Sequence, residues 1–162
     1  MTQPQRKTAP SPKPKAQEAI ALLRADHKLV SSLFEQYEAA RSVTKKKALV
    51  AQICQELTVH AQIEEEIFYP RVKQALKDKE LIPEAVVEHA TLKDLIAQIE
   101  DVEPDGEMYD AKVKVLSEYV KHHVKEEQNE LFPKVKGSKL DLVALGEELA
   151  QRKEELIAQL SK

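Results

Sequence analysis

The feature that most constrains the fold is a polar motif that occurs twice on otherwise apolar helical faces. The segment "HAQIEEEIFYP" spans residues 60–70, and "HVKEEQNELFP" spans residues 123–133. In each copy a histidine precedes a glutamate by four residues and a proline by ten residues. Residues four apart lie on one face of an α-helix, about 6 Å apart along its axis. Each copy therefore presents an imidazole and a carboxylate together, and the prolines are expected to kink or end the helices just beyond them.

The sequence around the motif extends it into a repeated pair of helices. His27 precedes His60 by 33 residues, and His89 precedes His123 by 34 residues. An acid stands directly before the first histidine of each pair, as "DH" and then "EH". The repeating unit is a helix with one histidine, a short turn, and a helix with His-x-x-x-Glu. Two such pairs related by a pseudo-twofold axis would bring all these side chains to the centre of one bundle.

The spacing of apolar residues predicts an all-α fold. Apolar residues recur at intervals of three and four along each expected helix, and three glycines without any tryptophan argue against a strand-rich fold. Helix breakers separate the helices at residues 41–44, 77–79, 104–106 and 137–138. Four long helices with short connections predict an antiparallel up-down four-helix bundle. An additional C-terminal amphipathic helix, over about residues 140–160, is expected to pack outside the bundle or to engage a partner.

Three regions are predicted along the chain. Residues 1–15 are rich in proline and basic residues and contain no acid, which predicts a disordered basic tail. Residues 16–136 are predicted to form the four-helix bundle, and residues 137–162 the amphipathic helix packed on it. The C-terminal helix and the N-terminal tail are the two segments through which a protein partner could bind.

Charge and hydropathy exclude several classes of function. A net charge of −3 gives no general attraction to nucleic acid or to an anionic membrane. No apolar run approaches the roughly 18 residues that cross a bilayer, and the first residues lack the apolar stretch of a secretory signal. One cysteine, Cys54, suits a reducing compartment. We therefore expect a cytoplasmic protein without nucleic-acid or membrane partners.

Six polar residues on the predicted core faces point to a pair of metal ions. They are His27, His60, Glu64, His89, His123 and Glu127. A buried carboxylate without a partner is costly, so two carboxylates beside four imidazoles require a common partner. If both glutamates bridge two metals, each metal receives two imidazoles and two carboxylate oxygens. This donor set suits iron, with manganese or zinc as alternatives, and does not suit calcium or magnesium.

The same residues, with "IFYP" and "LFP" after the two motifs, resemble the hemerythrin-like (HHE cation-binding) domain over about residues 16–136. The resemblance implies a four-helix bundle around a non-haem di-iron centre. It assigns the four histidines as terminal ligands and the two glutamates, Glu64 and Glu127, as bridges. The family includes oxygen carriers, oxygen or redox sensors, iron-responsive regulators and proteins linked to peroxide or nitric oxide handling.

Two positions depart from the oxygen-carrying members of this family. Lys93 stands where those members have a fifth histidine, and Gln128 stands where they have a bridging aspartate. The loss of a nitrogen ligand disfavours reversible oxygen carriage and favours reaction with peroxide or nitric oxide, or sensing. The expected function is binding of, or reaction with, O2, H2O2 or NO in a stress or redox response. The alternative is an iron- or oxygen-sensing regulatory or interaction module without turnover; catalase- or peroxidase-like activity stays open.

No catalytic residue is identified, but Lys93 and Tyr119 are candidates for groups beside the metals. Lys93 follows His89 by one turn, and it either extends outward to solvent or supplies a cation or proton near a bound oxygen species. Tyr119 precedes His123 by one turn and either donates to a bound ligand or packs. Asp26 and Glu88 are expected to be surface groups or partners of the ligands.

Overall fold

The computed structural model describes residues 17–161, and every regular element in that range is helical. The prediction of an all-α fold is confirmed, while the predicted tail at residues 1–15 lies outside the described residues. The elements are α1 (Ala19–Ala39), α2 (Val43–Ile63), η1 (Glu64–Phe68), α3 (Tyr69–Leu76), α4 (Leu81–Ile99), α5 (Glu107–Glu126), η2 (Glu127–Leu131), α6 (Phe132–Lys136) and α7 (Leu142–Leu160).

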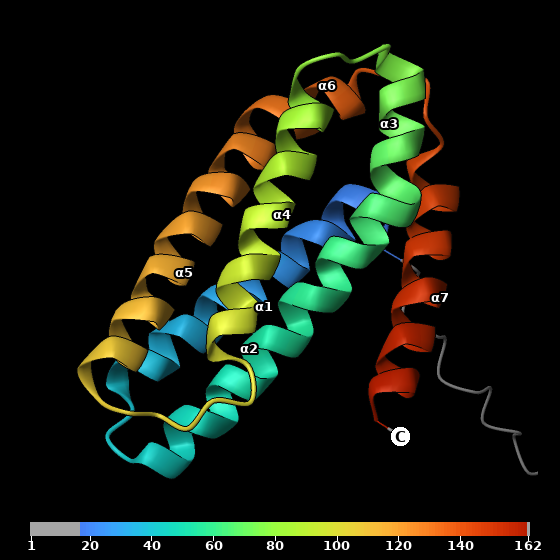
Figure 1. The fold of residues 1–162 in the computed structure, drawn as a ribbon. Helices are drawn as coiled ribbons and strands as arrows, with labels where there is room; N and C mark the ends of the chain where they lie inside the picture. Colours follow the sequence, from blue (N-terminus) through green and yellow to red (C-terminus); the bar gives the residue numbers. More distant parts are fainter. Residues whose placement is uncertain (1–16, 162) are drawn as a thin grey trace, which may run out of the picture.

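These elements form five helical rods within residues 17–161, because α2, η1 and α3 are continuous and so are α5, η2 and α6. Breaks between the rods fall at residues 40–42, 77–80, 100–106 and 137–141, close to the breakers in the sequence. Figure 1 shows α1, α2, α4 and α5 side by side along the molecule. The pairs α1–α2 and α4–α5, which correspond to the two halves of the repeat, pack directly against each other.

Both copies of the motif contain a π-helical turn, in which hydrogen bonds join residues five apart. The amide of Tyr69 donates to the carbonyl of Glu64, and the amide of Phe132 donates to the carbonyl of Glu127. A proline follows each turn, at Pro70 and Pro133. Proline has no N–H, and its ring clashes with the carbonyl four residues earlier in a regular α-helix. The wider turn accommodates the ring, so the helices do not end at the prolines but continue as α3 and α6.

The core is divided into two apolar clusters by a layer of polar residues. The first cluster includes Leu23, Ile63, Phe68, Tyr69, Ala85 and Leu131. The second includes Val30, Leu57, Leu92, Leu116 and Val120. Along each long helix the metal-ligand candidates lie between residues of the two clusters, as His27 lies between Leu23 and Val30. The fold therefore places one polar layer across the interior of the molecule.

The α7 helix covers one side of the first cluster. It packs against α1, α2 and η1, and three of its leucines are buried: Leu145, Leu149 and Leu156. Gly146 allows the close approach to α1, because a Cβ at this position would lie 2.9 Å from the amide nitrogen of Ala19. This helix thus extends the core beyond the two repeated helix pairs.

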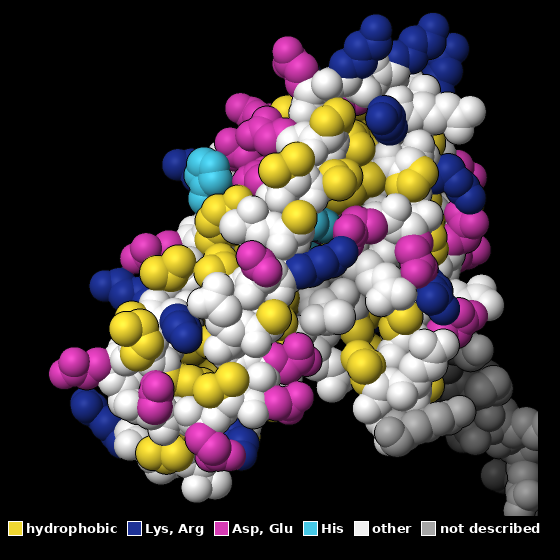
Figure 2. All heavy atoms as spheres, viewed as in Figure 1, with side chains coloured by type: hydrophobic (Ala, Val, Ile, Leu, Met, Phe, Trp, Pro, Cys, Tyr) yellow, Lys and Arg dark blue, Asp and Glu magenta, His cyan; other side chains and the backbone are white. Residues whose placement is uncertain are grey.

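The outer surface mixes charged and apolar side chains. Figure 2 shows acidic and basic groups interspersed with apolar ones on one face, while histidine occupies little of that face. In the described part of the chain, none of the helices combines the length and the apolar character that a membrane span requires.

Candidate metal centre

The six candidate ligands meet in the polar layer, although they come from α1, α2, η1, α4, α5 and η2. All are buried, from Glu64 at 0% exposure to His27 and His60 at 8%. The two glutamates stand at the first position of each π-helical turn, one α-helical turn after His60 and His123 respectively. The repeat in the sequence therefore becomes a repeat in space, with both halves contributing to one buried site.

The Nε2 atoms of the four imidazoles face the two carboxylates. His60 and His89 lie 3.0 and 3.3 Å from Oε1 of Glu64. His27 lies 3.4 Å from Oε1 of Glu127, and His123 lies 3.4 Å from Oε2 of the same residue. Each carboxylate thus lies between two imidazoles that come from different helices.

The ligand atoms fall into two groups, each compact enough to hold one ion. His27, His60 and Glu127 form the first group, and Glu64, His89 and His123 form the second. Within a group all ligand atoms lie within 4.8 Å of one another. Each group combines residues from both halves of the repeat, which agrees with carboxylates shared between two metal positions.

The Nδ1 atoms of the same rings face outward to polar side chains. His60 Nδ1 lies 2.9 Å from Oδ2 of Asp26, and His123 Nδ1 lies 3.3 Å from Oε1 of Glu88. The acid before the first histidine of each pair therefore contacts the histidine of the neighbouring helix. Asp26 is 4% exposed and Glu88 is 9% exposed, so neither is a surface group. An acceptor on Nδ1 orients the ring and leaves Nε2 free for a metal.

The Nδ1 atoms of the other two histidines also face polar side chains, although that of His89 has no hydrogen-bond partner. The side-chain amide nitrogen of Gln128 lies 3.0 Å from Nδ1 of His27, and Oε2 of Glu65 lies 3.6 Å from Nδ1 of His89. An amide can present its nitrogen or, after rotation, its oxygen to the ring. Gln128, which replaces a carboxylate of the oxygen-carrying members, is thus placed beside a ligand.

Tyr69 belongs to the site, although it was not predicted from the sequence. Its hydroxyl donates to Oε2 of Glu127 at 2.7 Å and lies 3.1 Å from Nε2 of His89. The side chain is 2% exposed, and burial together with the charges of Glu127 and Glu64 raises the pKa of its hydroxyl well above the usual range. In a regular α-helix Tyr69 would point away from Glu64, five residues earlier. The π-helical turn brings both to one face, and the shared "FYP" and "LFP" spacing is the only sequence signal of it.

The two predicted candidates, Lys93 and Tyr119, lie outside the cluster. The ammonium of Lys93 pairs with Glu65 at 2.7 Å, and its side chain is 55% exposed. It therefore reaches His89 only through Glu65. Tyr119 is partly buried and packs against the second apolar cluster. His122 lies at the surface, where its ring is 3.3 Å from Glu126.

The charges of the metal-free site are strongly coupled. Burial would lower the pKa of His60, but Glu64 and Asp26 hold it well above its usual range. Burial likewise opposes charge on His123, yet Glu127 and other nearby carboxylates raise its pKa to about 9. Burial would raise the pKa of Glu127, whereas hydrogen bonds with His123 and His27 hold it well below its usual range. Protons on His60 and His123 are thus favoured by the same carboxylates that would face a metal ion.

Unpaired polar atoms show that the residues present fit a metal pair. Within residues 17–161, several buried atoms at the centre have no hydrogen-bond partner: Nε2 of His27, Nε2 of His60, both carboxylate oxygens of Glu64 and Oε1 of Glu127. Nitrogen and oxygen atoms that face one another at 3.0 to 3.4 Å without hydrogen-bond geometry are arranged as donors to a shared cation. The donor chemistry, imidazole with carboxylate, is that of transition-metal ions.

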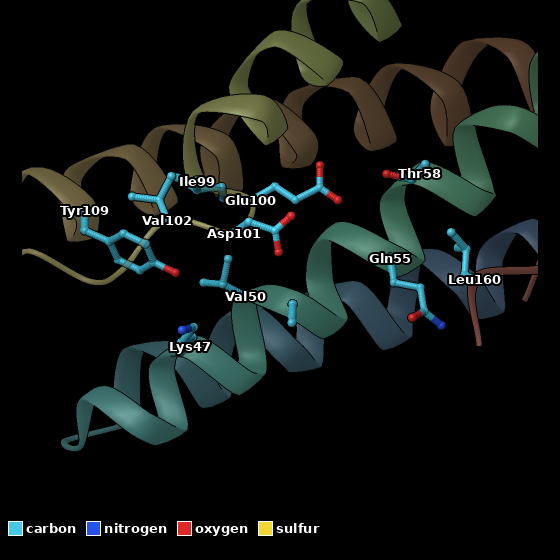
Figure 3. Close-up of a pocket in the computed structure, with 11 residues that line it drawn as sticks. Lys47, Val50, Gln55, Thr58, Ile99, Glu100, Asp101, Val102, Tyr109 and Leu160 are labelled. Atoms are coloured by element: carbon cyan, nitrogen blue, oxygen red, sulfur yellow. The ribbon is translucent and has the colours of Figure 1, made fainter. Parts of the chain in front are cut away.

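A small apolar cavity lies beside the imidazoles. Its volume is about 30 Å³, and apolar side chains of Val30, Leu57, Leu92 and Val120 line it together with the histidines. A larger hollow, of about 220 Å³, is lined by His27 and Gln128 among other residues. The groove in Figure 3, of about 220 Å³, is lined by residues such as Lys47, Gln55, Asp101 and Tyr109, and by none of the six candidate ligands. The cavity between the imidazoles therefore has room only for a small molecule, whereas the hollow beside His27 and Gln128 is larger.

Comparisons with known proteins agree with this geometry. The family model described as the hemerythrin HHE cation-binding domain matches residues 18–135. A solved structure of an HHE cation-binding domain protein from Mycobacterium kansasii superposes with a TM-score of 0.77 at 24% identity, covering 88% of this chain and 89% of that one. A protein from Nostoc sp. named "DNA nickase" is 30% identical over 117 residues, which is 72% of this chain. The chain spans about a third of that relative's length, 33%.

Proposed function

The chain belongs to the hemerythrin HHE cation-binding family, and on this premise we propose that it is a non-haem di-iron protein that binds or reacts with O2, peroxide or nitric oxide. One observation carries the proposal. Four buried imidazoles turn Nε2 toward two shared carboxylates, and the two outer acids, Asp26 and Glu88, orient two of the rings from behind. A site built only for structural stability would not leave buried carboxylate oxygens without hydrogen-bond partners.

In this proposal the two groups of ligand atoms each hold one iron. His27 and His60 hold the first ion and His89 and His123 the second, while Glu64 and Glu127 bridge. The donor set favours iron, with manganese or zinc as the alternatives. Bound iron would supply one-electron redox chemistry and an open coordination position for a small oxidant.

The residues of the chain define what such a centre can do. The 30 Å³ cavity has room for a molecule of about two or three heavy atoms beside His27 and His60, and apolar side chains line most of it. Tyr69 has a hydroxyl that stays protonated and lies 2.7 Å from Glu127. It is therefore the group best placed to donate a proton or a hydrogen bond to a ligand at the centre.

The proposal also includes the finer architecture and the cellular setting. We infer an antiparallel four-helix bundle over residues 16–136, with the helix of residues 137–162 added outside it. We also propose a cytoplasmic location and a protein partner that binds at α7 or at the N-terminal tail.

We do not propose a nicking activity like that named for the Nostoc relative, because a net charge of −3 provides no general attraction to DNA.

Metal analysis and visible absorption test this function. Protein purified from its own host is expected to contain about two irons per chain and to show absorption bands that change on addition of peroxide or nitric oxide. Steady consumption of peroxide would select an enzyme, and a single stoichiometric change with an altered oligomeric state would select the sensing alternative. Iron-free protein with no spectral response to either ligand after anaerobic addition of Fe(II) would contradict the proposal.

A further inference from the structure

The α7 helix lies beyond the residues that match the family model, yet it reaches the candidate metal centre. Two of its ion pairs hold it to the neighbouring helical rod. Arg71 pairs with Glu148 at 2.9 Å, and Arg152 pairs with Glu66 at 2.8 Å. Both pairs lie at the surface and involve no acid that contacts a candidate ligand. They add to the apolar docking of the helix, which packs against α1, α2 and η1 and is labelled in Figure 1.

A third ion pair of α7 has a different position. The ammonium of Lys153 lies 2.5 Å from Oδ1 of Asp26, whose other oxygen lies 2.9 Å from Nδ1 of His60. The Asp26 side chain is 6% exposed and that of Lys153 is 25% exposed. Both oxygens of this carboxylate thus have a partner, one from α7 and one from a candidate ligand. A buried carboxylate with two fixed partners has little freedom to rotate.

The second half of the repeat lacks this arrangement. Glu88 corresponds to Asp26 and contacts Nδ1 of His123 at 3.3 Å, but among the described residues no lysine or arginine pairs with it. Lys93 pairs with Glu65, but these two side chains are more exposed than those of Lys153 and Asp26. Glu65 in turn lies 3.6 Å from Nδ1 of His89, which is beyond hydrogen-bond distance. The α7 helix therefore makes the two groups of ligand atoms unequal, although the sequence repeat makes them similar.

We propose that Lys153 is a positioning residue of the metal centre, which fixes Asp26 and so aims Nε2 of His60 at the metal position shared with His27 and Glu127. The inference rests on the proposed metal centre. Without the ammonium, Asp26 keeps one partner in a buried setting, and its hold on the His60 ring loosens. The position that contains His60 therefore depends on α7 for its affinity, and the position that contains His89 and His123 does not.

Stepwise removal of iron by a chromogenic chelator tests this proposal. Lys153→Met removes the charge and keeps the length of the side chain, and Lys153→Arg keeps the charge. In Lys153→Met one of two iron equivalents is expected to bind about 10- to 100-fold more weakly, as is typical for loss of a partner behind a ligand. The affinity for the second iron equivalent should be unchanged. Lys153→Arg should bind the first equivalent almost as tightly as the wild type does.

Arg152→Met is the matched control, because Arg152 is the neighbouring residue and, within residues 17–161, its ion pairs involve only Glu66 and Glu155. An equal loss in Arg152→Met would show that docking of α7 alone matters and would overturn the proposal, as would unchanged affinity in Lys153→Met. A second readout uses the iron-free protein, where the Nδ1–H of His60 should exchange with solvent faster in Lys153→Met than in Arg152→Met. Equal exchange in the two would also overturn it.

Two further measurements distinguish an effect of Lys153 through Asp26 from a folding defect and from failure of the proposed function. In an Asp26→Asn background, Lys153→Met should add no further loss of iron affinity, since the carboxylate on which it acts is absent. If Lys153→Met does not fold, Lys153→Gln decides the same question with a smaller change. Failure of the wild-type chain to bind two irons would contradict the proposed function, whereas normal iron binding with no effect at Lys153 would contradict this inference alone.

Discussion

The hydroxyl of Tyr69 donates a 2.7 Å hydrogen bond to Oε2 of Glu127, and this bond joins the two halves of the sequence repeat. The corresponding residue of the second half is Phe132, whose ring stacks on His27 at a centroid distance of 6.0 Å. Tyr69 also lies against a histidine, His89, with ring centroids 5.2 Å apart, but the two rings are tilted by 42°. The repeat thus places an aromatic ring against the lone histidine of each half and a single hydroxyl at the centre of the site.

Tyr69→Phe should remove the contribution of the hydroxyl and keep that of the ring, because phenylalanine already occupies the equivalent position of the second half, Phe132. The iron-free protein should lose about 1–2 kcal/mol of unfolding free energy, because a buried carboxylate loses a donor. If the protein consumes peroxide, the rate should fall at least about tenfold, since proton donors typically contribute more than that. Urea unfolding and peroxide assays would measure both effects, with Tyr119→Phe as the control. Equal peroxide rates in the wild type and Tyr69→Phe would remove Tyr69 from the chemistry.

The iron-free protein should become less stable as pH rises from about 6.5 to about 9. The pKa of His123 rises from 6.5 in the unfolded chain to about 9 in the folded protein, mainly because Glu127 and nearby carboxylates outweigh the effect of burial. A group whose pKa is raised by folding stabilises the fold below its unfolded pKa and loses that effect above its folded pKa. The loss should be on the order of 2 kcal/mol.

The iron-loaded protein should show the opposite trend, because a metal requires unprotonated imidazole. Urea titrations of both forms between pH 6 and pH 9 would measure the two slopes. Parallel slopes would show that protons and iron do not compete for the same nitrogens.

Glu64→Gln should abolish most of the stabilisation that iron provides. Glu64 is fully buried, and its Oε1 lies 3.0 and 3.3 Å from Nε2 of His60 and His89. At a metal concentration 100-fold above the Kd, binding should stabilise the wild-type fold by about 3 kcal/mol. Thermal unfolding with and without Fe(II) would report the difference, and Glu118→Gln, at an exposed position of α5, is the control. An undiminished shift in Glu64→Gln would exclude Glu64 as a ligand.

Lys93→Ala should leave iron content unchanged and should alter stability by less than about 1 kcal/mol. Its ammonium is well exposed and pairs with Glu65, and surface ion pairs contribute little. Iron analysis and chemical unfolding would test this expectation. A large fall in peroxide or nitric oxide reactivity would instead support the alternative role of Lys93 as a cation beside a bound oxygen species.

Gly146→Ala should weaken the docking of α7. A methyl group there would lie 2.2 Å from the carbonyl oxygen of Gln17 and 2.9 Å from the amide nitrogen of Ala19, so α7 and the start of α1 would have to separate. Overpacking of this kind costs about 1–3 kcal/mol of unfolding free energy. Chemical unfolding would measure the cost, and Gly137→Ala is the control, because a methyl group there meets only ordinary contacts at 3.7 Å. Equal stability of the two variants would show that α7 adjusts freely.

The spacing of apolar residues was enough to predict an all-α fold, and the repeated pattern of histidine and glutamate within it was enough to predict the six residues that converge. Periodicities of three and four place side chains on one face of a helix, and burial of charged groups in such a face demands a partner. The pairing of helices in sequence also brought Asp26 and Glu88 to attention, because an acid stands before the first histidine of each pair. The sequence did not predict that each acid contacts the histidine of the neighbouring helix, as Asp26 contacts His60 and Glu88 contacts His123.

Only the tertiary structure decided which residues surround the ligands. Tyr69 enters the site because a π-helical turn changes the register after Glu64, and a regular helical pattern points it elsewhere. Lys153 reaches Asp26 because α7 folds back onto α1 across 127 residues of sequence, and no local spacing encodes that contact. Local periodicity fixes the face on which a side chain lies, whereas the partner it meets depends on how separate helices pack.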